Sequence, residues 1–415
     1  MSETASTPTL ICCDRFRIVE GRIHVQKRSW EMIRNFADHM ARPVFAMHED
    51  PAEKTLTFPL PPGVEVIRLP SDSPSQRITG PLLNRPWVPA IENLLADNCL
   101  VYLRMPHWTC CRIFQRARAH NNRIMASFHG NWAEGYRNKP GSGLSRITAQ
   151  LLARHTDRWY RTIARHSEIL FCTGQRLQET YGDLAPRNVV IANFLHGSGD
   201  ICQDITPRAL KSPCHILFVG SLEERKGLIH LLNSIAMLSR ESVETRLTII
   251  GTGPLRQSLV DKAAGLGIGE RVTFVDYIQY GQELYDRFRA ADLFVLPSIS
   301  SEGVPKVLVE SMSQGVPVIA TDIGSSRDLL DNGRRGLVIP PGDENALCQA
   351  IRTLISDDSL RQSLIEQGIE FAKASTRDVQ RAKIRQALEE TVPDILGVPA
   401  WMDPGLSPRP AQLVD

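Results

Sequence analysis

The sequence predicts an α/β protein made of two Rossmann-like domains, each a parallel sheet covered by helices. A chain of 415 residues exceeds what one ordinary hydrophobic core accommodates, which indicates two domains. Short apolar runs alternate with helix-like segments along most of its length. The runs Thr9–Cys13 and His215–Val219 each open such an alternation as an apolar strand followed by a loop that contains glycine.

The expected domain boundaries follow from where this alternation stops. We expect a first domain over residues 1–195 and a second over residues 214–374, joined by a polar linker at 196–213. A further helix is predicted over residues 375–392. The proline-containing tail over residues 393–415 is expected to be irregular.

Composition narrows the class of protein. The formal net charge is +2, which gives no general argument for nucleic-acid binding. The nine cysteines are scattered without a C-x-x-C spacing, which disfavours a zinc ribbon or a disulfide framework and fits a reducing cytosol. The first residues lack the basic and apolar regions of a signal peptide, and no apolar run reaches transmembrane length. We therefore expect a cytoplasmic protein.

Basic residues concentrate in one part of the first domain. Fourteen Lys or Arg residues stand against five Asp or Glu residues between Arg104 and Arg187. The segment Arg146–His166 has helical periodicity, with Ile147 and Leu151 on its apolar side. One interpretation is a core helix with a solvated basic face, favoured because the helix leads straight into an apolar strand. The other is a peripheral contact with anionic lipid at the cytoplasmic face of a membrane.

Two loops of the first domain carry candidate site residues. Gly21 follows the first predicted strand and precedes a helix expected from about residue 24 to residue 40, so it belongs to a binding loop or to a plain tight turn. His129 follows the apolar strand Ile124–Phe128 and precedes Gly130. It therefore lies at the carboxyl end of a strand, where open α/β sheets bind ligands.

The second domain opens with a basic loop. Gly220 ends the first strand of this domain and allows backbone to approach a ligand closely. Arg225 and Lys226 follow, and each charged hydrogen bond to a phosphate is worth about 1.5–3 kcal/mol. Two cations at the positive end of a helix are unfavourable unless an anion compensates them. We interpret the loop as an anion-binding site rather than only a basic helix start.

A second glycine-rich turn follows the strand Leu247–Ile250. Gly251 and Gly253 begin a dinucleotide fingerprint, but Arg256 stands where its third glycine belongs. The turn therefore does not predict a dinucleotide site.

The stretch from residue 293 to residue 310 carries the most chemistry. The apolar strand Leu293–Leu296 leads into a loop and then a helix, in whose first turn Pro305 is well placed. The free N–H groups of Lys306 and Val307 form a ready anion site at the helix N-terminus. The candidate site residues of this stretch are Glu302, Gly303, Val304, Pro305 and Glu310.

The run EGVPKVLVESMSQGVPVIATDIGSSRDLL, followed by GLVIPPGD, resembles the signature of GT-B glycosyltransferases of the GT4 type. These enzymes use nucleotide-sugar donors and retain the configuration of the sugar. Their hallmark is two glutamates separated by seven residues, and Glu302 and Glu310 match it. The competing interpretation, a solvated helix face with two acids, is disfavoured because Glu310 lies in an otherwise apolar helix. The resemblance covers residues 215 to about 372 well and the first domain loosely.

The resemblance implies a GT-B fold, in which two Rossmann-like domains face each other across a cleft and the helix at 375–392 packs back on the first. It implies transfer of a hexosyl group to an acceptor hydroxyl of a glycan, a lipid-linked sugar or a small molecule, as in surface polysaccharide or glycoconjugate synthesis. It assigns Glu310 to the ribose hydroxyls and Glu302 to the sugar hydroxyls, and it places His129 beside the donor sugar. Glu302 and His129 are thus the expected catalytic residues.

The same resemblance places Gly21 where donor phosphate and acceptor meet, and Trp132 either stacks on a sugar or packs internally. No Asp-x-Asp motif is present, so neither a metal nor a cofactor is implied. Three rival functions remain open: a GT-B phosphorylase, a nucleotide-sugar epimerase and an inactive scaffold protein. The last is disfavoured because Glu302, Glu310, Arg225 and Lys226 are all present.

Overall fold

The chain folds into two compact units. The computed structural model describes residues 7–51, 57–69, 88–137, 143–192, 194–205, 210, 212–300, 304–402 and 411–414. The first unit comprises Met1–Leu195 together with Val379–Asp415, and the second comprises His196–Asp378. The second unit is thus inserted, in sequence, between two parts of the first.

The first unit is built on a largely parallel sheet. Its main strands, in spatial order, are β16 (Gln412–Val414), β5 (Glu65–Leu69), β3 (Pro43–Glu49), β1 (Thr9–Val19), β6 (Leu100–Met105), β7 (Arg123–Phe128), β8 (Ile169–Thr173) and β9 (Arg187–Ile191). Each neighbouring pair in this order is parallel. Such a sheet is covered on both faces, which explains why the strands read as nearly continuous apolar runs.

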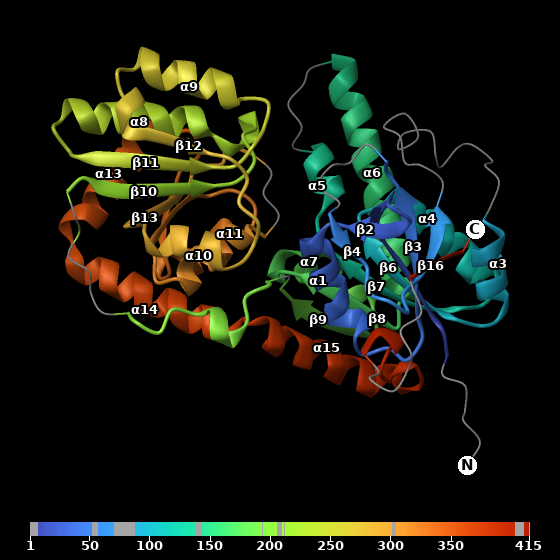
Figure 1. Cartoon of the computed structure of the whole chain (residues 1–415). Coiled ribbons are helices and arrows are strands. Elements are labelled where there is room, and N and C mark those ends of the chain that lie inside the picture. Colours follow the sequence, from blue (N-terminus) through green and yellow to red (C-terminus); the bar gives the residue numbers. More distant parts are fainter. Residues whose placement is uncertain are drawn as a thin grey trace. The chain divides into compact units, whose positions relative to one another are not determined.

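Helices bury the two faces of this sheet separately (Figure 1). Leu10 of β1 belongs to a core that includes residues of α3 (Pro89–Ala96), α4 (Trp108–Ala119), α6 (Gly143–His166) and α7 (Gln175–Tyr181). The next residue, Ile11, belongs to a second core with α1 (Lys27–Ala37) and α15 (Arg377–Thr391). This alternation is the side-chain period of a strand.

The start of the chain differs from the prediction. β1 is longer than the predicted strand Thr9–Cys13, and it turns into β2 (Arg22–Val25), which pairs with it antiparallel and also with β4 (Phe58–Pro59). Glu20 and Gly21 form the turn, with φ of 50° and 75°. Positive φ at both central residues is the type I′ geometry of a two-residue hairpin. Gly21 therefore forms a tight turn, and α1 begins only at Lys27. Its role in binding stays a prediction.

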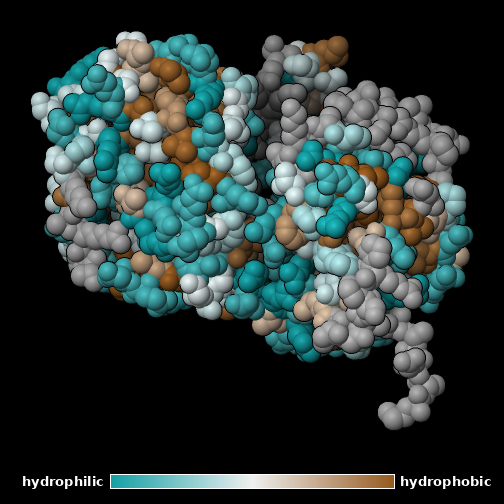
Figure 2. Space-filling model, viewed as in Figure 1, coloured by the Kyte–Doolittle hydropathy of each residue, from teal (hydrophilic) through white to brown (hydrophobic). Residues whose placement is uncertain are grey.

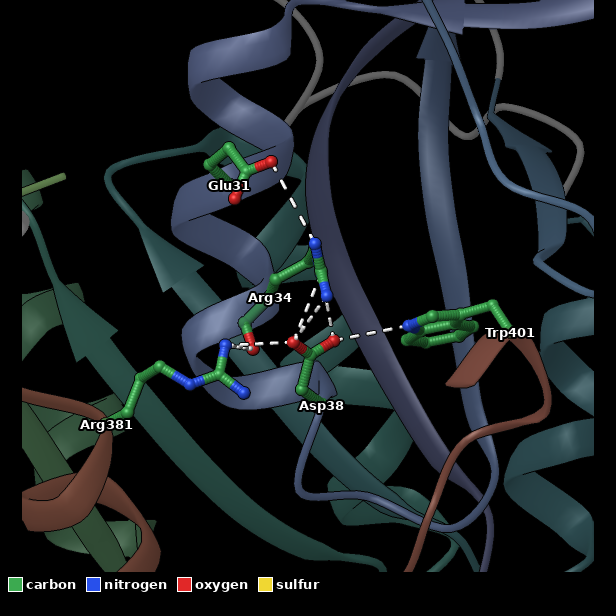
Figure 3. A network of polar contacts seen from close by, with 5 residues as sticks. All are labelled: Glu31, Arg34, Asp38, Arg381 and Trp401. Carbon is green, nitrogen blue, oxygen red and sulfur yellow. Dashed lines mark hydrogen bonds and ion pairs between the residues drawn. The ribbon is translucent and has the colours of Figure 1, made fainter. Parts of the chain in front are cut away.

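A buried carboxylate ties the C-terminal part of the first unit to α1 (Figure 3). The side chain of Asp38 is fully buried. It accepts hydrogen bonds from Arg34 Nε at 3.1 Å, Arg381 Nη1 at 2.8 Å and Trp401 Nε1 at 3.2 Å. Arg381 lies on α15, so this cluster joins a helix near the start of the chain to segments near its end.

The neighbouring His39 makes the stability of the first unit depend on pH. Burial, together with the charges of Arg381 and Arg385, lowers the pKa of His39 to about 4, and the charge of Asp38 opposes this shift. Since the unfolded side chain titrates near pH 6.5, the unfolded state binds the additional proton as the pH falls from about 6.5 to 4. The free energy of unfolding should therefore decrease over that range.

We expect a loss of about 1 kcal/mol between pH 7.5 and pH 5, a figure reduced to allow for the partial exposure of the ring. His39→Gln should remove this part of the pH dependence, as measured by denaturant unfolding at both pH values. An identical pH dependence in the variant and the wild type would contradict this assignment.

The second unit contains one parallel sheet. Its strands, in spatial order, are β12 (Val272–Val275), β11 (Thr245–Ile250), β10 (Cys214–Val219), β13 (Leu293–Leu296), β14 (Val318–Thr321) and β15 (Leu337–Ile339). Its helices are α8 (Leu228–Arg240), α9 (Arg256–Gly265), α10 (Gln282–Arg289), α11 (Lys306–Ser313), α12 (Ser326–Leu329), α13 (Glu344–Ser356) and α14 (Asp358–Ala374). Figure 1 shows α8 and α9 on one side of the sheet and α10, α11 and α14 on the other.

The strand order reverses between β10 and β13. From β10 the chain builds outward through β11 to β12, and it then returns to place β13 on the other side of β10. Open α/β sheets bind ligands at the carboxyl ends of the two strands that flank such a reversal. We therefore expect a ligand site at the loops after β10 and β13.

The boundary between the units falls after Leu195, as predicted, but the tail is not wholly irregular. The described start of the expected linker packs against the second unit, because Cys202 N donates to Ser313 O at 2.8 Å and Gln314 Nε2 donates to Asp200 O at 2.7 Å. The expected irregular tail contains β16, which pairs with β5 in the sheet of the first unit. Residues 206–209, 211, 403–410 and 415 lie outside the described part of the chain.

Candidate functional site

The loops after β10 and β13 are joined to each other. Ile299 N, in the loop after β13, donates a hydrogen bond of 2.8 Å to Arg225 O in the loop after β10. On the other side, Thr321 Oγ1 at the end of β14 donates to Ser298 O at 2.5 Å. The structure thus brings together the two loops in which the sequence predicted phosphate and sugar contacts.

Glycines allow these loops to pack backbone against backbone. A Cβ added to Gly227, whose φ is +65°, would lie 2.1 Å from Pro297 O. A Cβ on Gly251 would lie 1.9 Å from Gly220 O, and one on Gly253 would lie 2.5 Å from Leu222 O. Real Cβ atoms do not approach oxygen so closely, so only glycine fits. The sequence analysis rejected Gly251 and Gly253 as a dinucleotide motif and missed this packing role.

The two predicted cations have different environments. Arg225 Nε donates to Glu223 Oε2 at 2.6 Å, and Arg225 Nη2 lies 3.4 Å from Ser221 Oγ. The loop therefore supplies its own carboxylate to Arg225, whereas the sequence argument required an external anion. Lys226 is only 8% exposed, in a short 3₁₀ turn (Glu224–Lys226) that precedes Gly227 and α8. A buried ammonium is costly unless an opposite charge or a hydrogen-bond acceptor compensates it.

The helix after β13 begins one residue later than predicted. Pro305 is the N-cap residue of α11 rather than its first helical residue, and Leu308 N reaches back to Pro305 O at 3.1 Å. Val304 precedes it in the loop. The N-terminus of α11 therefore lies at the carboxyl end of β13, as the predicted anion site requires. Glu302 and Gly303 lie outside the described residues, so their predicted roles stay predictions.

Glu310 is buried in α11, with 4% of its surface exposed. Its charge acts on His196, whose pKa is lowered by burial, and on Tyr280, whose pKa is raised by burial and by the adjacent hydroxyl of Tyr285. Asp200 adds to the field at both residues. The Glu310 carboxylate is thus buried rather than solvated. This argues against the interpretation of two acids on a solvated helix face.

Sequence reasoning missed His196 and Tyr280. His196 lies in the expected linker, and Tyr280 lies in a loop after β12 with no motif of its own. Their proximity to Glu310 comes from the fold alone.

In the first unit, His129 is held by both ring nitrogens. Nε2 lies 2.7 Å from Ser127 Oγ, and Nδ1 lies 3.1 Å from Thr173 Oγ1. The Tyr102 hydroxyl donates a hydrogen bond of 2.8 Å to Ser127 Oγ. This bond fixes the Ser127 side chain that contacts His129. His129 lies at the carboxyl ends of β7 and β8, as predicted, in a fixed ring orientation.

Aromatic rings cluster in the segments that follow β6 and β7. Trp132, at the start of α5 (Trp132–Arg137), lies 6.1 Å from Trp108, whose ring stacks on His155 of α6 at 6.0 Å. Both tryptophans are half-buried. The two indole rings are inclined by 57° to each other, and a partly exposed ring face of either one suits stacking against a sugar ring.

The described residues contain no group of three or more His, Cys, Asp or Glu side chains arranged to hold a metal ion. Of the helices in the described part of the chain, none has the length and apolar character needed to cross a membrane.

The second unit matches a known family. Residues 207–371 match the family model described as "Glycosyl transferases group 1". Among curated proteins, an exopolysaccharide phosphotransferase of Streptomyces coelicolor is 31% identical over 50% of this chain and 21% of its own length. The phosphatidyl-myo-inositol mannosyltransferase of Mycobacterium leprae is 31% identical over 42% of this chain and 46% of its own length. The chain thus spans less than half the length of each of these relatives.

Solved structures match more of the chain. HepE of Anabaena, in complex with UDP, is similar over 93% of this chain and 99% of its own, with a TM-score of 0.64 and 17% identity. At this identity the similarity concerns the fold, and it extends to both units.

Proposed function

Because residues 207–371 belong to the glycosyl transferases group 1 family and the chain has the GT-B fold, we propose that this protein moves a sugar from a nucleotide diphosphate sugar to an acceptor hydroxyl. The observation that carries the proposal is the joined pair of loops at the strand reversal of the second unit. Arg225 and Ile299 are hydrogen-bonded there, beside buried Lys226 and the N-terminus of α11. The loop after β10 carries two cations and the loop after β13 leads to a helix N-terminus, and open α/β sheets bind diphosphates at such strand ends.

In this proposal the second unit binds the donor. Lys226, Arg225 and the N–H groups at the start of α11 hold the diphosphate, and Glu310 accepts hydrogen bonds from the ribose hydroxyls. Anabaena HepE binds UDP, which makes UDP the first nucleotide to test. The same groups stabilise the negative charge that the diphosphate gains as the bond to the sugar breaks.

We propose a retaining reaction of the GT4 type that needs no metal. The bond between the sugar carbon and the diphosphate oxygen breaks as the acceptor oxygen bonds to the same face of that carbon. The departing diphosphate takes the proton from the acceptor hydroxyl. Fixed cations perform the charge neutralisation that a divalent ion performs in other transferases.

The first unit supplies the acceptor side. Trp132 and Trp108 offer apolar ring faces for the acceptor, while His129, fixed by Ser127 and Thr173 at the end of β7, keeps its predicted catalytic role beside the donor sugar. The named relatives act on an exopolysaccharide and on a phosphatidylinositol. We therefore propose a glycan or a lipid-linked sugar as the acceptor and a cytoplasmic location for the protein.

The two glutamates give the sharpest test. Glu310→Gln keeps the shape of the side chain but weakens its hydrogen bonds to ribose, so the affinity for free UDP should fall about ten- to a hundredfold. Glu302→Gln should leave the affinity for UDP nearly unchanged while sugar transfer falls, since Glu302 is assigned to the sugar. Calorimetry with UDP and transfer kinetics over a panel of nucleotide sugars, both in EDTA, measure these effects.

Glu370→Gln is the matched control, because Glu370 is an exposed helical glutamate on α14 of the same unit. It should change neither measurement. If Glu310→Gln and Glu302→Gln both behave like this control, the assignment of the site fails. Activity that appears only when Mg²⁺ or Mn²⁺ replaces EDTA would contradict metal independence, and exchange of label from orthophosphate into the donor would indicate a phosphorylase.

A further inference from the structure

The N-terminal half of α6 exposes large apolar side chains. Leu144 is 77% exposed, Ile147 56%, Leu151 57% and Leu152 41%. The sequence analysis placed Ile147 and Leu151 on the side of a core helix, and the structure shows that this interpretation was wrong for this half of the helix. Exposed apolar side chains grouped in this way usually mark a contact surface.

The opposite side of α6 is the one that packs on its own unit. Ala149, Ala153, Thr156, Tyr160 and Ile163 are buried and follow one another at intervals of three or four residues. At 100° per residue, Leu144, Ile147 and Leu151 lie on the side of the helix facing away from them. These exposed residues therefore form a separate stripe that the core of the first unit does not cover.

Arginines continue the same stripe. Arg154, Arg158 and Arg165 follow Leu151 at helical spacing, and Arg146 lies among the leucines in sequence. Within the part of the chain that the structure describes, Arg146, Arg154 and Arg158 are exposed and take part in no ion pair. The only acidic residue of α6, Asp157, is engaged by Arg161 and Arg137. The stripe is thus apolar at the N-terminal end of α6 and basic beyond it.

Figure 1 shows the N-terminal half of α6 projecting beyond the sheet of the first unit, and Figure 2 shows hydrophobic atoms at that projecting end. Along the helix, Leu144 and Leu151 are separated by roughly 10 Å at 1.5 Å per residue. Amphipathic helices bury their apolar faces about 5–10 Å into the headgroup and acyl boundary of a bilayer. Three exposed apolar side chains on one side of about two helical turns are therefore available to enter this boundary.

We propose that the N-terminal half of α6 docks on an anionic lipid surface. Leu144, Ile147 and Leu151 enter the boundary between headgroups and acyl chains, and Arg154 and Arg158, one and two turns further on, lie at the level of the lipid phosphates. An anionic bilayer has apolar acyl chains inside and anionic phosphates at its surface, and so it matches both the apolar and the basic part of the stripe. A second copy of this chain matches the stripe less well. If two stripes packed together, the arginines of one copy would face either the leucines or the arginines of the other. This surface is independent of the proposed transfer reaction.

The test measures binding of the full-length protein to sedimented vesicles of phosphatidylcholine, with and without phosphatidylglycerol. The wild type should bind the anionic vesicles and lose that binding as salt is raised. The double variant Leu144→Ser with Leu151→Ser should reduce the partition coefficient between vesicles and water at least about tenfold. Each substitution removes an apolar side chain that would otherwise enter the boundary between headgroups and acyl chains. Arg154→Gln and Arg158→Gln should each reduce binding about fivefold, and only to anionic vesicles.

Matched controls lie on the second unit. Val260 of α9 is 37% exposed and Arg240 ends α8, so Val260→Ser and Arg240→Gln change similar groups elsewhere and should leave vesicle binding unchanged. Equal vesicle binding by the leucine variant and the wild type, or no binding by the wild type, would overturn the proposal. Concentration-dependent dimerisation of the wild type that the leucine variant lacks, without vesicle binding, would overturn it in favour of a second copy.

UDP affinity is measured in the same preparations. It should be unchanged in the α6 variants, because α6 belongs to the first unit and the proposed nucleotide residues belong to the second. If the protein binds vesicles but not UDP, lipid docking is supported and the proposed function is contradicted. If it binds UDP but not vesicles, the proposed function is supported and lipid docking is contradicted.

Discussion

Gly251→Ala should lower the free energy of unfolding of the second unit by more than about 3 kcal/mol and abolish binding of UDP. The new Cβ would lie 1.9 Å from Gly220 O, and the φ of 147° at position 251 disfavours any residue with a Cβ. Gly220 N already donates to Ile250 O at 3.0 Å, so this loop has little freedom to move away. Separation of the two loops would displace the backbone that leads to Arg225 and Lys226.

Gly265→Ala provides the control for this change. Gly265 ends α9 with nothing within 4 Å of an added Cβ and without a positive φ. Alanine should be neutral or slightly stabilising there, because it reduces the entropy of the unfolded chain. Thermal unfolding and calorimetry with UDP compare the two variants. Normal UDP affinity in Gly251→Ala would show that the close approach is not needed for the site.

Asp38→Ala should destabilise the first unit by about 1–3 kcal/mol, since it leaves three partly buried donors without their acceptor. Three side chains donate to Asp38, from Arg34, Arg381 and Trp401 (Figure 3). Denaturant unfolding followed by tryptophan fluorescence measures the loss, because Trp401 reports on this cluster directly.

Glu390→Ala is the comparison for that prediction. Glu390 pairs with Arg187 also within the first unit, but both side chains are more than 40% exposed. Exposed pairs are worth about 0–1 kcal/mol, so this variant should unfold almost like the wild type. If the two variants lose similar amounts of stability, burial does not set the strength of the Asp38 cluster.

The sequence predicted most of the strand and helix order, because parallel strands buried on both faces leave unmistakable apolar runs. It predicted the positions of Arg225, Lys226 and His129 at strand ends for the same reason. The length of β1 escaped it, since Arg15 and Arg17 are polar residues in a strand and read as loop. Periodicity also identified α6 as amphipathic without showing whether another element covers Ile147 and Leu151.

The contacts around the candidate site depended on the fold. The approach of Gly251 to Gly220, and of Gly227 to Pro297, joins strands that are adjacent in space but distant in sequence. The field of Glu310 at His196 and Tyr280 arises in the same way. A single sequence offers no signal for such pairs, because each partner alone is an ordinary loop residue.

The insertion of the second unit into the first has a consequence for synthesis on the ribosome. α15 and β16 complete the first unit, yet they are translated after all of His196–Asp378. At roughly 5–20 residues per second, the first part waits about 10–40 s for them while the second unit is synthesised. Throughout that interval the nascent chain exposes the apolar face on which α15 later packs, including Ile33 and Phe36 of α1. This apolar face is therefore where a chaperone would be expected to bind the growing chain.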